Sequence, residues 1–195
     1  GDNTTGYQNV ALGFESMSND TSGGNNTAVG RSTMYQNTTG YQNVALGRQA
    51  LYNNTTGNSN TCIGDLAADS TTTGIGNVCV GHQALDKNTS GSRNTAIGQF
   101  ALRDTTTSSS SVAVGYAALM SNTGSGFNTA VGYQALTSGT SAENNTAVGF
   151  AALYSATTGN NNTSVGAYAN DSNTTGANNV AVGRNSLGAN ISGNH

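Results

Sequence analysis

The phrase Asn128-Thr129-Ala130-Val131-Gly132 returns throughout the chain, and its closing glycine keeps a constant spacing. Each closing glycine follows the previous one by 17 residues, as Gly30 follows Gly13, with no insertion or deletion in between. A fixed period of this kind is typical of repeat architectures, in which each repeat packs only against its neighbours. We interpret these glycines as bends: Gly13, Gly30, Gly47, Gly64, Gly81, Gly98, Gly115, Gly132, Gly149, Gly166 and Gly183.

The residues before each glycine predict a short β-strand. Val or Thr and then Val, Ile or Leu occupy alternate positions with a small residue between them, as in Thr27-Ala28-Val29. Alternation of β-branched residues with period two is typical of a strand. The small middle residue suggests that the opposite face of this strand is also covered, at close range.

A second short strand is expected after the glycine, where most repeats carry Ala-Leu, as in Ala135-Leu136. We expect this Leu to contact the Val or Ile of the first strand, and we expect the Ala column at the interface if copies associate. A helix is disfavoured because no repeat has more than about six residues free of Gly, Asn or Thr clusters, and so short a helix is unstable.

The sequence therefore predicts an all-β fold, a parallel β-solenoid (β-roll) of eleven stacked 17-residue turns with two short strands per turn. We expect residues 1–195 to form a single repeat array without an internal domain boundary. The chain opens and closes within a repeat, at Gly1 and His195, so we expect a segment of a longer fibre.

When the repeats stack, the residues at one repeat position form a column that runs along the solenoid. One column is the Asn that heads the phrase, interrupted by Ser111, and stacked Asn side chains can hydrogen-bond along a parallel β stack. We predict a structural ladder of Asn9, Asn26, Asn43, Asn60, Asn77, Asn94, Asn128, Asn145, Asn162 and Asn179. A second column contains the turn threonines Thr4, Thr21, Thr38, Thr55, Thr72, Thr89, Thr106, Thr123, Thr140, Thr157 and Thr174.

Composition limits the classes of function. Hydrophobic residues make up 34% and charged residues 8% of the chain, which taken alone would suggest disorder, but the apolar residues always recur at the same repeat positions. The net charge of −3 includes no basic stripe, so no nucleic-acid partner is expected. No apolar stretch approaches the roughly 20 residues that span a bilayer, so no membrane insertion is expected.

No catalytic residue, cofactor or metal site is predicted, and we interpret the protein as a non-enzyme. Of the two histidines, His82 occupies a variable position and His195 ends the chain, and neither has ligand-type partners at suitable spacing. Asp65, Asp69 and Asp86 lie in neighbouring repeats, and we interpret them as a solvated face rather than a calcium site.

Two cysteines and one Asn interrupt otherwise regular columns. Cys62 and Cys79 replace the central Ala in adjacent repeats, about 4.8 Å apart, which permits either a disulfide or two buried thiols. We favour buried thiols that act as small hydrophobic residues. In the tenth repeat Asn170 stands where Leu belongs, so local weakening is expected there.

The position after the glycine predicts an exposed aromatic stripe of Tyr116, Tyr133 and Phe150. Aromatic side chains are common platforms for sugars and partner proteins, so this stripe is a candidate interaction site. The alternative is a stripe that shields the edge of the roll or packs between protomers.

Repeats such as 128–136 and 111–115 resemble the head repeats of trimeric autotransporter adhesins, and more closely the longer repeats of phage tail fibres and large bacterial surface fibres. The resemblance implies a left-handed β-roll, commonly trimeric, on a cell or virion surface. The adhesin head repeat is shorter and lacks the additional turn seen here at Asn37-Thr38-Thr39-Gly40.

We therefore expect a structural or adhesive extracellular fibre segment, a rigid shaft that self-associates as a homotrimer or filament. The alternative is a module that binds a cell-surface glycan or receptor through the aromatic stripe. A lesser alternative is an ice-binding solenoid that uses the Thr column.

Overall fold

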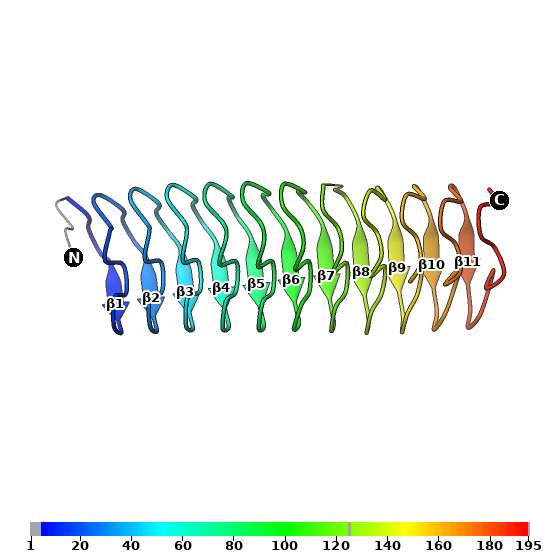
Figure 1. Cartoon of the computed structure of the whole chain (residues 1–195), viewed down its shortest axis with the longest axis horizontal. Coiled ribbons are helices and arrows are strands. Elements are labelled where there is room, and N and C mark those ends of the chain that lie inside the picture. Colours follow the sequence, from blue (N-terminus) through cyan, green and yellow to red (C-terminus); the bar gives the residue numbers. More distant parts are fainter. Residues whose placement is uncertain (1–4, 125, 195) are drawn as a thin grey trace.

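The computed structural model describes residues 5–124 and 126–194, so Thr4 and His195 lie outside the described residues. Eleven parallel strands lie side by side in a single row from one end of the molecule to the other (Figure 1). At the usual strand spacing the row is about 50 Å long. The predicted parallel β-solenoid is confirmed, with strands β1 (Val10–Leu12), β2 (Thr27–Val29), β3 (Val44–Leu46), β4 (Thr61–Ile63), β5 (Val78–Val80), β6 (Thr95–Ile97), β7 (Val112–Val114), β8 (Thr129–Val131), β9 (Thr146–Val148), β10 (Thr163–Val165) and β11 (Val180–Val182).

The strands pair without any shift of register. Each residue faces its equivalent 17 positions later, as Ala45 faces Cys62 between β3 and β4. Backbone hydrogen bonds continue around the turn outside the strands; for example, the N–H of Thr55 donates to the carbonyl oxygen of Thr72 at 2.9 Å. Most of the backbone of one repeat is thereby held by the next repeat, which explains why the period tolerates no insertion.

The prediction of a second strand in each turn is wrong, because the Ala-Leu segment forms a sequence of tight bends. In the eighth repeat Gln134 and Leu136 have φ angles of 53° and 48°. These angles lie in the left-handed region, whereas a β-strand requires negative φ angles. A left-handed Leu is disfavoured by its Cβ. Here the conformation is stabilised by a hydrogen bond from the N–H of Leu136 to the carbonyl oxygen of Ala152, 3.0 Å long, and by complete burial of the Leu side chain.

The core is built from small residues and one Leu per turn. The middle residue of each strand from β2 to β9, such as Ala130, and the Ala-Leu pair, such as Ala135 and Leu136, are fully buried in one continuous cluster. The expected contact of this Leu with the Val or Ile of the strand is wrong, because those β-branched side chains point outward. The expected Ala interface is also wrong, since the Ala column lies inside the roll.

Cys62, Cys79 and Asn170 replace the usual Ala or Leu of the core. Cys62 and Cys79 are free, buried and directly paired across β4 and β5. Burial, together with the adjacent Cys79 thiol, raises the pKa of the Cys62 thiol well above its ordinary value. Asn170 occupies the Leu position in the core, and neither its side-chain oxygen nor its side-chain nitrogen has a hydrogen-bond partner.

Candidate functional site

The Asn column lies inside the roll and hydrogen-bonds in three directions. The side chain of Asn60 donates from Nδ2 to Oδ1 of Asn43 at 3.2 Å and to the carbonyl oxygen of Gly74 at 2.9 Å. Its Oδ1 accepts a hydrogen bond from the backbone N–H of Asn77 at 2.9 Å. Each Asn therefore ties its own strand to the turn of the next repeat and to the strands on both sides.

A second interior Asn column was not predicted. Asn37, Asn54 and Asn173 are fully buried at the start of the Asn-Thr-Thr-Gly turn, and Asn54 Nδ2 donates to Asn37 Oδ1 at 2.8 Å. Asn173 Oδ1 accepts a hydrogen bond from the N–H of Gly176 three residues later, at 2.8 Å. The Asn-x-x-Gly spacing of this local turn was the available signal.

The Thr column lies outside, on the turn. From Thr21 to Thr157 each hydroxyl donates to the backbone carbonyl of the equivalent Thr in the next repeat, as Thr38 Oγ1 donates to Thr55 O at 2.9 Å, and Thr174 Oγ1 donates to Ile191 O at 3.2 Å. The hydroxyl protons are thus used within the roll, which makes this column a structural ladder.

The bend glycines from Gly13 to Gly166 lie where the backbones of successive turns approach closely. All eleven have φ between 115° and 140°, a range that side chains other than glycine rarely adopt. At Gly115 a β-carbon would lie 2.3 Å from the carbonyl oxygen of Gly132, so there is no room for a methyl group.

The aromatic stripe is longer than predicted. Tyr116, Tyr133 and Phe150 stack with ring centroids 5.0 and 5.1 Å apart. The stripe continues by edge contacts to Phe100 at one end, 5.8 Å from Tyr116, and to Tyr168 at the other end, 5.2 Å from Phe150. Phe100 and Tyr168 were missed because they occupy the second position after the glycine rather than the first.

Stacking leaves few ring faces free along this stripe. Tyr133 lies between two nearly parallel rings, at interplanar angles of 14° and 5°, so that both of its faces are covered. It is nevertheless 46% exposed. The middle of the stripe therefore presents ring edges, which favours the structural interpretation of Tyr133, and free faces are expected only where the stacking ends.

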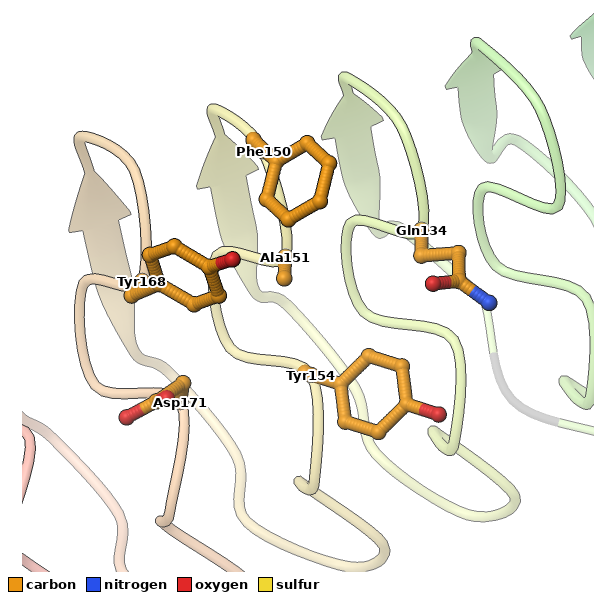
Figure 2. A pocket seen from close by; sticks show the side chains of 6 residues that line it. All are labelled: Gln134, Phe150, Ala151, Tyr154, Tyr168 and Asp171. Carbon is orange, nitrogen blue, oxygen red and sulfur yellow. The ribbon is translucent and has the colours of Figure 1, made fainter.

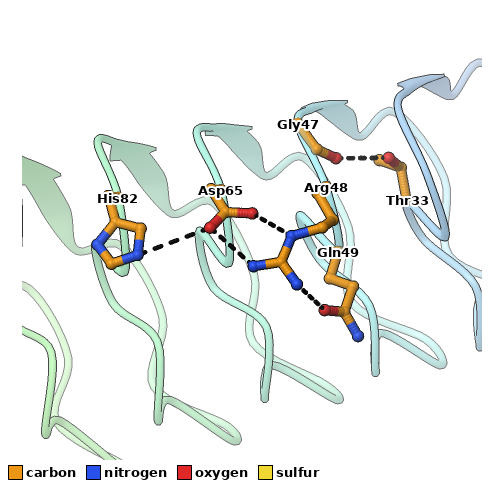
Figure 3. Close-up of polar contacts among 6 residues, drawn as sticks. All are labelled: Thr33, Gly47, Arg48, Gln49, Asp65 and His82. Carbon is orange, nitrogen blue, oxygen red and sulfur yellow. Dashed lines mark hydrogen bonds and ion pairs between the residues drawn. The ribbon is translucent and has the colours of Figure 1, made fainter.

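Charged groups gather on the turns of the third to sixth repeats. Figure 3 shows Asp65 between Arg48 and His82, with Arg48 Nε donating to Asp65 Oδ1 at 2.7 Å and His82 Nε2 3.6 Å from Asp65 Oδ2. Burial and the neighbouring carboxylate of Asp86 raise the pKa of Asp69 to about 6. The chain thus has a carboxyl group that titrates near neutral pH.

The outward face of the sheet is flat, open and uncharged. Two side chains per strand point outward, a Thr or Val and then a Val, Ile or Leu. Ile63 and Val165 are each 37% exposed even within the row, where neighbouring strands cover part of every side chain. We call this surface the sheet face; it measures about 50 Å by 7 Å between side-chain columns. The second of these two columns is apolar along the whole row, and an exposed apolar surface is typical of an interaction site.

Among residues 5–124 and 126–194, no group of three or more His, Cys, Asp or Glu side chains could hold a metal ion. The same residues contain no helix long and apolar enough to cross a bilayer. Comparison of the chain with protein-family models, curated protein sequences and solved structures gave no match.

Proposed function

We propose that this chain is a rigid segment of an extracellular fibre and that its function is mechanical reach. The observation that supports this proposal is the unbroken register of eleven strands, in which both backbone and side chains of each turn are hydrogen-bonded to the next. A stack of this kind resists bending because every bend must lengthen several columns of hydrogen bonds together. The resemblance to fibre repeats supports a cell or virion surface as its location.

Self-association as a homotrimer completes this proposal, with the sheet face as the contact. The face has no charged side chain, and its column of Val, Ile and Leu is apolar along the whole row. Burying such a column stabilises an assembly in proportion to the apolar area removed from water. The fibre resemblance favours three copies around a common axis. Contact through the sheet face would also protect the exposed Val and Ile columns from water.

Light scattering combined with small-angle X-ray scattering tests this proposal. The chain has a mass of 19.5 kDa, and we expect an elongated particle of about three times that mass. The double substitution Val114→Lys and Val131→Lys, in the middle of the sheet face, is expected to release monomers. Gln99→Lys, on the exposed turn, serves as the control. A monomer for the unmodified chain, or a trimer that survives the double substitution, would contradict the proposed contact.

A second candidate function is binding of a glycan or receptor at the aromatic stripe. It is favoured by a row of five aromatic side chains, of which Phe100 is half-buried and Tyr116, Tyr133, Phe150 and Tyr168 are exposed. Binding of the chain to glycan-bearing surfaces, and its loss when Tyr133 is changed to Ala, would support this function; equal binding by the variant would count against the stripe.

A further inference from the structure

The aromatic stripe ends beside a hollow in the surface of the ninth and tenth repeats. The hollow has a volume of about 320 Å³ and is lined by Gln134, Phe150, Ala151, Tyr154, Tyr168 and Asp171 (Figure 2). This volume lies at the lower end of the range for small-molecule sites. It is suited to a single ring-sized group rather than to an extended ligand.

The hollow exists because two register positions carry alanine. Ala151 occupies the position of Gln134 in the preceding repeat and of Tyr168 in the following one, so that a methyl group forms the floor where larger side chains stand on either side. Ala167 replaces the aromatic residue that Phe150 supplies one repeat earlier. The ring of the tenth repeat comes instead from Tyr168, and the parallel stacking ends there.

Ring surface becomes available at this break in the stacking. Phe150 and Tyr168 meet edge to face, at an interplanar angle of 62°, in contrast to the parallel stacking of Phe150 on Tyr133. Across the hollow, Tyr154 is 37% exposed and contacts no other aromatic ring within residues 5–124 and 126–194. Figure 2 shows the three rings around Ala151, with Tyr154 on the opposite side from Phe150.

The polar groups of the hollow match hydroxyl groups. Asp171 supplies carboxylate acceptors and forms no ion pair with any described residue, and Gln134 supplies both an acceptor and donors. No Lys, Arg or His lines the hollow. A negatively charged ligand would therefore meet the uncompensated charge of Asp171, whereas a neutral ligand rich in hydroxyl groups would not.

We propose that this hollow binds one neutral pyranose unit of a glycan. The C–H face of the sugar packs against the ring of Tyr154 or Tyr168, and its hydroxyl groups donate to Asp171 and exchange hydrogen bonds with Gln134. The proposal rests on the second candidate function, glycan binding at the aromatic stripe, and restricts it to the end of the stripe where ring faces are free.

An earlier part of the chain carries the same Tyr and Asp at equivalent positions but lacks the alanine that forms the floor of the hollow. Tyr52 and Asp69 stand six repeats earlier at the register positions of Tyr154 and Asp171. There Gln49 takes the position of Ala151, and Leu66 that of Tyr168. Tyr52 is also covered by Tyr35, whose ring stacks on it at 5.2 Å. The same pair of side chains without the alanine floor provides matched control positions.

Saturation-transfer NMR on the whole chain tests the proposal. The probes are methyl β-glucopyranoside, methyl β-galactopyranoside and methyl N-acetyl-β-glucosaminide, with glucuronate as the anionic comparison. We expect at least one neutral glycoside to receive saturation, most strongly on its ring C–H protons, and glucuronate to receive little. Ala151→Leu should fill the hollow and reduce the signal about fivefold or more, and Tyr154→Ala should act similarly by removing a stacking surface.

The controls are Gln83→Leu and Tyr52→Ala, which make equivalent changes at the same register positions away from the hollow and should leave the signal unchanged. Ala151→Leu is expected to fold because Leu66 already occupies this register position, with φ of 57° against 50° for Ala151. Circular dichroism checks this expectation, and Tyr154→Ala provides the independent test.

Two results would overturn the proposal, and they differ in what they leave standing. If no neutral glycoside receives saturation, both the hollow and glycan binding by the stripe fail. If glucuronate binds equally well, or if binding persists in Ala151→Leu and Tyr154→Ala but is lost in Tyr133→Ala, the hollow fails while the stripe remains a glycan site. The mass of the assembly reports on the fibre proposal independently.

Discussion

A β-carbon built on Gly64 would lie 2.5 Å from the carbonyl oxygen of Gly81, the equivalent glycine one turn further along the solenoid. We expect Gly64→Ala to lower the free energy of unfolding by about 4 kcal/mol or more, because two backbones must separate in the middle of the stack. Denaturant unfolding measures the loss. Gly183→Ala is the matched control: its φ is 115°, but nothing lies within 4 Å of the added carbon, so only the backbone strain of about 1–3 kcal/mol should appear. Equal losses would show that close stacking does not explain the glycine column.

The Asn ladder predicts a second large effect. Asn60→Ala removes two donated and two accepted hydrogen bonds inside the roll, leaving the carbonyl of Gly74 and both the N–H and the Nδ2 of Asn77 without these partners. The expected loss is about 3 kcal/mol in the free energy of unfolding, since each orphaned buried group costs about 1–3 kcal/mol.

Asn60→Ser should cost less than Asn60→Ala. The natural Ser111 still accepts a hydrogen bond from the N–H of Asn128, although the distance is 3.4 Å. If the Ser and Ala variants are equally stable, the accepted hydrogen bond contributes nothing.

The core contains a position where a substitution should stabilise the protein. Asn170→Leu replaces a fully buried side chain without hydrogen-bond partners by the residue that fills this column in the preceding repeat, Leu153. The two positions have φ angles of 51° and 52°, so no backbone change is required. We expect the free energy of unfolding to rise by about 1–3 kcal/mol. The reverse substitution, Leu153→Asn, should destabilise by a comparable or larger amount, and thermal unfolding of both variants tests the pair.

Asp69 predicts a pH dependence of stability. Its pKa is raised to about 6, chiefly by burial and then by Asp86, so the folded protein binds its proton more tightly than the unfolded chain. Stability contributed by this group is therefore greatest below pH 4 and falls as the pH rises through 6. Asp69→Asn should raise Tm at pH 7.5 by about 2–4 °C and have no effect near pH 3.5.

Substitution of Asp104 should change Tm in the opposite direction to substitution of Asp69. Burial alone would raise its pKa, but hydrogen bonds from Arg103 and Lys87 outweigh burial and lower it. Asp104→Asn should therefore lower Tm at pH 7.5. If both Asn variants shift Tm in the same direction at this pH, the assignment of the two environments is wrong.

The sequence was sufficient to predict the solenoid, its period and its columns, because equivalent residues recur at fixed spacing and parallel stacking brings them together. It was not sufficient to predict the path of the chain within one turn. Ala135-Leu136 has the composition of a strand or a helix end, and nothing in the residue types indicates that Leu136 adopts a left-handed conformation. That conformation depends on hydrogen bonds with the adjacent turns, which are contacts between repeats and not local preferences.

The sequence alone also did not predict which face of the strand is buried. Alternation in Thr27-Ala28-Val29 shows that two faces differ, and the larger side chains are usually the buried ones. Here the turn is so tight that the inward position holds only small residues such as Ala28, Cys62 and Ser164, and Val29 lies on the outward face. For the candidate site, the stripe from Tyr116 to Phe150 could be predicted from its register, whereas the hollow depends on the small Ala151 and on the changed position of Tyr168.

The uniform register also has an evolutionary consequence. Removing or duplicating 17 residues within a regular part of the array leaves each remaining turn with neighbours of the same kind, since Ala45 pairs with Cys62 just as Ala96 pairs with Ala113. Unequal recombination between the repeated coding segments would therefore change the length of the molecule in steps of about 4.8 Å without creating a new interface. An insertion or deletion of any other number of residues would shift one repeat against the next and break the pairing in every column. Variation in length is therefore expected to occur only in whole turns.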